Sequence, residues 1–130
     1  KMVAYYYYQL VDKNVIPDDC TKFYCYYYYL TKLPELPQSL VDLHCSYNKL
    51  TELPELPQSL TKVYCSNNNL TELPELPQFL NELWSGDNPI QYITKYNYEI
   101  MKKIYCNINN TPFFDNSGLS IEEFFSEGFL

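Results

Sequence analysis

Glycine, histidine and positive charge are scarce in this 130-residue chain. Its three glycines lie at positions 86, 118 and 128 and form no glycine-rich loop of the kind that cradles a phosphate. The single histidine has no serine, cysteine or carboxylate that the sequence places beside it to complete a catalytic set. Nine basic residues against sixteen acidic ones give a net charge of −7, and no cluster of lysines marks a phosphate-binding surface. The composition therefore argues against an enzyme and against a nucleic-acid partner.

Long apolar runs are absent as well. No run approaches the roughly 20 residues of a membrane helix, and no charged-then-apolar signal segment opens the chain. The five cysteines are an odd number, so a closed disulfide framework cannot use all of them. With 46% hydrophobic and 18% aromatic residues, the chain is still too apolar to stay disordered. We expect a single soluble, acidic domain.

A 20-residue repeat organises the chain. The text of residues 50–59, LTELPELPQS, recurs almost unchanged 20 residues earlier and 20 residues later. The stretches between these copies share a second pattern, L-x-x-L-x-C-x-x-N-x-L, which begins at Leu40, Leu60 and Leu80 with small variations. A repeat of this period is typical of a solenoid, in which each coil buries its apolar face against its neighbours.

This pattern resembles the leucine-rich repeat, with cysteine or serine in the third apolar slot. The short period and the L-P-x-L-P text are similar to the subtype found in secreted effectors of enteric bacteria. The cysteine-containing copies are also similar to repeat proteins of large amoeba-infecting DNA viruses. The resemblance implies an α/β leucine-rich repeat solenoid over residues 1–111, with about five repeats, the first of them incomplete. It further implies a parallel β-sheet on the concave face and a role in binding another protein.

Asparagine holds one position of the repeat, just after the predicted strand. There its side chain is predicted to turn inward and to bond backbone groups of its own and the adjacent coil, which cost about 1–3 kcal/mol each when unpaired. This asparagine ladder consists of Asn48, Asn68, Asn88 and Asn109. The preceding Asn67 is expected to point outward and to contribute little to stability. The prolines of the L-P-x-L-P text exclude helix from the return segments and favour an extended, polyproline-like path there.

Cysteine recurs at an inward position. We predict that Cys25, Cys45, Cys65 and Cys106 share one buried column, with Cys20 in a leucine slot. No C-x-x-C pair suggests a zinc site, and side chains packed in a column are poorly aimed for disulfides. Buried free thiols indicate a reducing, cytoplasmic compartment, or a virion.

The N-terminal coil departs from the repeat. Val3, Tyr5, Tyr8 and Leu10 are predicted to fill its slots, so Tyr8 and Tyr28 stand where the ladder asparagine belongs. Either these coils turn more loosely with the rings outside, or the letters of the two tyrosine runs differ from those of the natural chain. No earlier coil covers this end, whose strand edge would be unpaired. We therefore expect either that residues precede this sequence or that another subunit packs on residues 1–10.

The C-terminal part loses the L-P-x-L-P text after Ile90. Apolar residues at helical spacing predict a helix over residues 92–103 on the convex side. The template then resumes over residues 101–109 after a one-residue insertion. Residues 112–130, which contain a capping-box pattern, are predicted to form a helical C-terminal capping segment.

Outward strand positions are where the repeat does not dictate residue identity. One predicted column alternates in charge: Lys22, Asp42, Lys62, Glu82 and Lys103. The next is aromatic: Tyr24, His44, Tyr64, Trp84 and Tyr105, with Tyr47 beside it. Alternating charges favour stacking in register. The aromatic column either stacks along the sheet as a structural ladder or forms a partner-binding face, since such residues are enriched in interfaces.

These features predict a non-enzymatic module that binds another protein on its concave face. No catalytic residue, metal, cofactor, nucleic acid or membrane is expected to take part. One alternative is a structural component of a particle such as a virion, packing through its ends and edges. A second is the substrate-recognition part of an effector-like ligase, because bacterial relatives of this repeat type can precede a catalytic cysteine domain.

Overall fold

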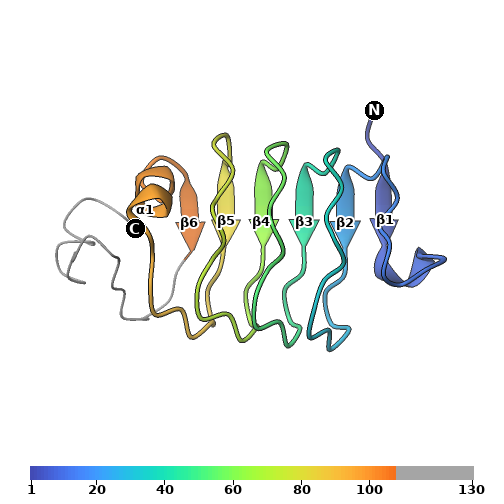
Figure 1. Cartoon of the computed structure of the whole chain (residues 1–130), viewed down its shortest axis with the longest axis horizontal. Coiled ribbons are helices and arrows are strands. Elements are labelled where there is room, and N and C mark those ends of the chain that lie inside the picture. The colour runs from blue at the N-terminus through green and yellow to red at the C-terminus, as the bar shows by residue number, and fades with distance from the viewer. Residues whose placement is uncertain (108–130) are drawn as a thin grey trace.

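The structure, a computed structural model, describes residues 1–107. Six three-residue strands form one parallel sheet in chain order, so each coil contributes one strand and lies beside the next (Figure 1). The strands are β1 (Ala4–Tyr6), β2 (Lys22–Tyr24), β3 (Asp42–His44), β4 (Lys62–Tyr64), β5 (Glu82–Trp84) and β6 (Tyr105–Asn107). This architecture confirms the predicted parallel-strand solenoid.

The middle residue of each central strand points into the core. Strand side chains alternate between faces, and the middle residues Phe23, Leu43 and Val63 are completely buried. The register is direct, with Phe23 beside Leu43 and Leu43 beside Val63. Equivalent residues of successive coils therefore stack as continuous apolar columns, which leaves the first and third residues of each strand on the outer surface.

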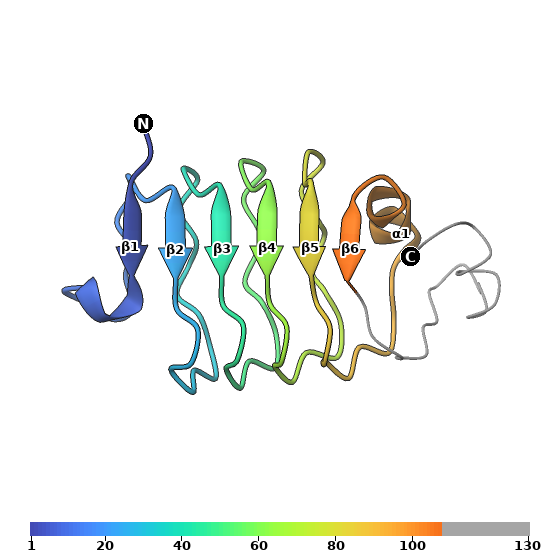
Figure 2. The ribbon, with the colours of Figure 1, turned by 180° about the vertical axis from the view of Figure 1, so that it is seen from behind.

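The return segments run extended along the opposite side of the sheet, as Figure 2 shows from behind. Between β2 and β5 they contain no helix, as the prolines predict. Each closes with a tight turn in which a proline carbonyl accepts the N–H of the leucine three residues later, for example Leu60 to Pro57 at 3.2 Å. The leucines of the L-P-x-L-P text are buried at the same time, so these segments supply the other wall of the core.

One helix, α1 (Lys95–Met101), lies within the predicted range 92–103. The Thr94 side chain caps its first turn by accepting the N–H of Asn97 at 3.1 Å. The Asn97 side chain is buried and bonds the preceding return segment, accepting from the Leu76 N–H at 2.8 Å and donating to the Pro74 carbonyl at 2.9 Å. The repeat pattern does not predict this role for Asn97. Its docking fixes the helix against the coil before it.

The last coil is longer than predicted. In β6, Tyr105 pairs with Glu82 and Cys106 pairs with Leu83. The predicted register of this coil, which allowed for one inserted residue, is therefore wrong by two residues. Cys106 consequently takes the leucine slot rather than the cysteine column, and Lys103 lies outside the sheet. The reason is that α1 rises less per residue than an extended segment and uses more residues to cover the same path. Asn109 and the predicted cap, 112–130, lie outside the described residues.

The first coil is shorter than the others, and its predicted register is also wrong by two residues. Tyr5 pairs with Phe23, and Tyr5 and Tyr7, rather than Val3 and Tyr5, pack partly buried against the core. A 3-10 turn over Tyr7–Gln9 follows the strand. With this shift Tyr8 no longer stands at the asparagine position. Tyr8 and Tyr28 both lie outside the core, 63% and 38% exposed.

The described ladder asparagines join each coil to the one before it. Asn68 donates to the carbonyls of Cys45 and Cys65, both at 3.1 Å, and accepts the Leu50 N–H at 3.0 Å. Asn48 and Asn88 make equivalent bonds. One buried amide thus pairs backbone groups of two coils at the point where the strand ladder stops.

Asn67 is not the neutral neighbour that sequence analysis expected. Its φ is 57°, in the left-handed region that asparagine tolerates and alanine does not. The same backbone position is held by Tyr27, Tyr47 and Asp87, with φ between 56° and 66°. Asn69, which is exposed and has no positive φ, is the suitable control.

We expect Asn68→Ala to lower the free energy of unfolding by about 1–3 kcal/mol, because it leaves buried backbone groups of two coils unpaired. Asn69→Ala should change it by less than about 0.5 kcal/mol. Urea unfolding followed by circular dichroism measures both. Equal losses would mean that the inward amide does not hold the coils together.

The left-handed conformation of an exposed tyrosine yields a second stability test. Tyr29 has a φ of 56°, and its ring is 78% exposed. Tyr29→Asn should raise the free energy of unfolding by about 0.5–1 kcal/mol, since asparagine adopts this conformation at lower cost. The same urea titration measures the gain, and a less stable variant would show that the Tyr29 ring contributes packing that its exposure conceals.

Candidate binding face

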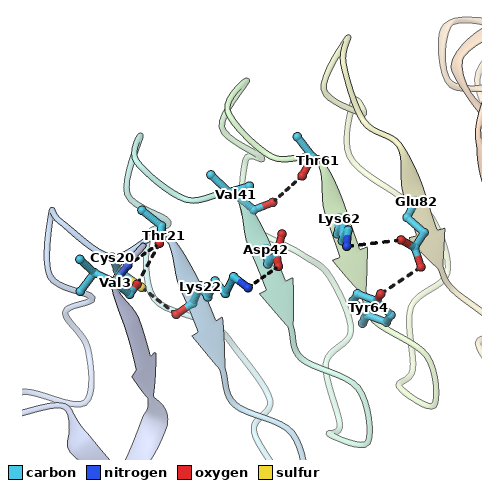
Figure 3. Close-up of polar contacts among 10 residues, drawn as sticks. All are labelled: Val3, Cys20, Thr21, Lys22, Val41, Asp42, Thr61, Lys62, Tyr64 and Glu82. Atoms are coloured by element: carbon cyan, nitrogen blue, oxygen red, sulfur yellow. Dashed lines mark hydrogen bonds and ion pairs between the residues drawn. The ribbon is translucent and has the colours of Figure 1, made fainter. Parts of the chain in front are cut away.

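The first outward column of the sheet is charged and pairs within itself. The ammonium of Lys22 lies 3.7 Å from the Asp42 carboxylate, and that of Lys62 lies 3.9 Å from Glu82 (Figure 3). Asp42 is nearly buried, at 8% exposure. The place predicted for Lys103 belongs to Tyr105. Within each pair the two opposite charges offset one another. The column therefore stabilises the register between neighbouring strands more than it provides a charged surface.

A continuous run of rings, which we call the aromatic stripe, follows the second outward column of the sheet and ends at Tyr105 beside that column. Its members are Tyr6, Tyr24, His44, Tyr64, Trp84 and Tyr105. Ring centroids are 4.5 Å apart between His44 and Tyr64, close to the spacing of the strands. The widest step, 6.0 Å, separates Tyr64 from Trp84.

Both ends of the aromatic stripe differ from the predicted column. Tyr6 was missed, because the two-residue shift of the first coil moves it beside Tyr24, where the rings stack at 4.8 Å. Tyr105 is not in the column, since Asn107 is the residue that pairs with Trp84. The Tyr105 ring nevertheless reaches 5.1 Å from that of Trp84 across the diagonal. The described strands therefore all contribute one ring.

Glu82 holds two rings of the aromatic stripe in place. One carboxylate oxygen accepts the Tyr64 hydroxyl and the Trp84 indole N–H, each at 2.9 Å. The bond from Trp84, followed by that from Tyr64 and the charge of Lys62, lowers the pKa of Glu82. Burial and the hydrogen bond to Glu82 raise the pKa of Tyr64 to about 12. Glu82 stays ionised near neutral pH, and its hydrogen bonds hold both rings in place.

His44 is enclosed between two tyrosine rings of the aromatic stripe. Tyr24 and Tyr64 stack on its faces at 4.6 and 4.5 Å. Burial lowers its pKa, with the charges of Lys22 and Lys62 acting in the same direction and those of Asp42 and Glu82 opposing them. The imidazole is therefore neutral at pH 7, and it serves as another flat ring.

Tyr47 belongs to a second, smaller stack beside the aromatic stripe. Its ring lies parallel to that of Tyr27, with centroids 4.5 Å apart and an interplanar angle of 11°. Both rings are exposed, at 47% and 64%. This pair extends the aromatic surface beyond the ends of the strands.

The five thiols are all free and buried, as predicted. Burial raises the pKa of Cys25 and of Cys65 to about 12, and that of Cys20 to about 11. They are thus protonated, poor nucleophiles and poor metal ligands. Among residues 1–107, no group of histidine, cysteine and carboxylate side chains could hold a metal ion. Over the same range no helix is long and apolar enough to cross a bilayer.

Comparison with solved structures identifies the architecture. The structure of YopM from Yersinia enterocolitica WA-314 superposes with a TM-score of 0.70 and 31% sequence identity, over 82% of this chain. The chain has a leucine-rich repeat fold. Its short repeats are of the bacterial-effector-like type. The predicted likeness to viral repeat proteins stays a prediction.

This leucine-rich repeat chain spans only part of the structures it matches. It covers 23% of the YopM chain. A leucine-rich repeat domain of a Shigella effector matches at 26% identity and a TM-score of 0.46, over 78% of this chain and 64% of that domain. No protein-family model and no curated protein matches the sequence.

The enclosed histidine predicts a pH-dependent stability. Because the folded state lowers the pKa of His44 below its ordinary 6.5, the unfolded chain binds more protons as the pH falls below that value. The contribution of His44 to the free energy of unfolding is therefore fully present above pH 6.5. It is lost progressively as the pH falls below that value. His44→Tyr, which copies the residue of both neighbouring coils, should unfold with a shallower dependence on pH between about 5 and 7. Urea midpoints across that range measure the difference, and parallel curves would contradict it.

Proposed function

We propose that the concave face binds another protein through the aromatic stripe. The observation that carries the proposal is the continuity of the stripe, with one ring from every described strand on the outer surface of the sheet. The effector-like leucine-rich repeat fold is consistent with a protein-binding role, although a fold alone would be a weak warrant.

The energetics of the aromatic stripe suit an interface. Aromatic side chains with a polar tip bury large areas and have few rotatable bonds to immobilise, so they lose little conformational entropy on binding. Such residues dominate binding hot spots. Here the central rings of Tyr64 and Trp84 lose even less freedom, because Glu82 already holds them. The adjacent charges of Lys62 and Glu82 are paired with each other. Binding energy would therefore come chiefly from the rings.

The proposed role is non-enzymatic and needs no cofactor. His44 is a neutral ring between two tyrosines. The buried thiols are protonated. Neither group has the exposed, activated geometry of a nucleophile with its base.

Truncating a central ring tests the proposal. We expect Trp84→Ala to abolish affinity capture of the native partner, with a loss of about 2 kcal/mol or more in binding free energy. The thermal melt should stay close to that of the wild type, because the side chain points away from the core. Tyr96→Ala removes an exposed tyrosine of α1 instead and should leave capture unchanged.

Two other outcomes would count against the aromatic stripe. Normal capture by the Tyr64→Ala, Trp84→Ala double variant would exclude it as the binding site. Loss of assembly only in variants of residues 1–10 would favour the alternative, a structural component that packs through its ends and edges.

A further inference from the structure

A cavity lined entirely by tyrosine opens on the outer surface of the sheet beside β1 and β2. Its volume is about 320 Å³, and its lining residues, which we call the tyrosine box, are Tyr6, Tyr24, Tyr26, Tyr27 and Tyr28. Two of them, Tyr6 and Tyr24, also belong to the aromatic stripe. The box is thus continuous with the proposed binding face but extends past the strand ends.

One ring of the tyrosine box, that of Tyr26, is perpendicular to two of the others. Tyr26 is perpendicular to Tyr24, with an interplanar angle of 87° and centroids 6.4 Å apart. It is also perpendicular to Tyr27, at 86° and 6.0 Å. The faces of Tyr24 are covered by Tyr6 and His44, and one face of Tyr27 is covered by Tyr47. Exposed ring surface remains at the corner between Tyr26 and Tyr27, which are 41% and 64% exposed. Corners of this kind attract cations through the negative charge on each ring face.

The backbone conformation of Tyr27 points to a use for its ring. Its φ of 66° is uncommon for a large side chain; Tyr47 of the next coil shares it at 59°, whereas Asn67 and Asp87 of the two later coils are types that tolerate it. The Tyr27 ring is held by stacking on Tyr47 outside the box. Because Tyr47 has the same conformation and stacks on Tyr27, two adjacent coils each hold an exposed ring here at a backbone cost.

Charge identifies the class of group that fits. The whole protein carries a net charge of −7, and no charged side chain of either sign lines the tyrosine box. Lys22, on the same strand as Tyr24, is paired with Asp42. Elsewhere in the chain tyrosine rings already face cations, with the ammonium of Lys102 lying 4.9 Å from the centre of the Tyr98 ring. A positively charged partner is therefore favoured over an apolar one.

We propose that the tyrosine box receives the guanidinium of an arginine side chain of the protein partner. The proposal rests on the proposed function, since it names the chemistry that one end of the concave face recognises. Guanidinium is favoured over the lysine ammonium because it is planar and weakly hydrated. It can lie flat on one ring of a perpendicular pair while its edge meets the other.

Small-molecule titration tests the chemistry without any substitution. The probe is N-acetyl-arginine methylamide, followed through the ring signals of the tyrosines by nuclear magnetic resonance. We expect saturable shifts at the box, and binding at least about fivefold weaker for the neutral citrulline analogue. Equal binding of citrulline, or tighter binding of N-acetyl-proline methylamide, would overturn the cation assignment. Tighter binding of the trimethyl-lysine analogue would overturn the choice of arginine.

Matched variants locate the site. Tyr26→Leu removes the shared perpendicular wall and should weaken arginine binding about three- to fivefold. Tyr26→Phe keeps the ring and should bind like the wild type. Tyr29→Leu, in the same tyrosine run but outside the box, serves as the control. Wild-type affinity in Tyr26→Leu would sink the proposal, since leucine preserves apolar contact but not the π-face.

The two hypotheses can fail separately. Partner capture that is lost in Trp84→Ala but unaffected by Tyr26→Leu would keep the binding face and reject the tyrosine box. Arginine binding by a protein whose Tyr64→Ala, Trp84→Ala variant still captures its partner would keep the box and reject the aromatic stripe.

Discussion

The hydrogen bonds of the buried asparagines are the interactions on which the other features of this solenoid depend. A strand of three residues pairs few backbone groups, and the chain must then turn back while its next N–H and C=O groups are already buried. Asn48, Asn68 and Asn88 supply those partners from the following coil. Since each amide bonds two coils at once, it sets their separation and their register together.

Because the register between coils is constant, the outward residues of successive coils form a continuous surface. When each coil lies directly beside the last, outward residues recur at strand spacing, so flat rings stack and opposite charges meet. His44 shows the consequence, because its neighbours enclose it and keep it neutral. Glu82 shows another, since one oxygen serves both Tyr64 and Trp84. The aromatic stripe is thus ordered by the same stacking that orders the core.

Prediction succeeded where the repeat is regular and failed where it ends. The inward columns, the extended return segments and the approximate place of α1 follow from period, proline and apolar spacing. The registers of the first and last coils do not, and Tyr6, Tyr105 and Cys106 were misplaced as a result. A 3-10 turn and a helix consume different numbers of residues per coil, and sequence spacing does not reveal those numbers.

The sequence by itself determined the solenoid, its parallel sheet, its asparagine ladder and most of the aromatic stripe, because a residue repeated every coil needs only local rules to find its place. Tertiary structure alone decided how side chains meet between coils. The stacking of Tyr27 on Tyr47 and the docking of Asn97 on the preceding return segment arise from contacts between coils. Such contacts depend on side-chain angles and on where the irregular end coils settle, and neither quantity is written in the period of the repeat.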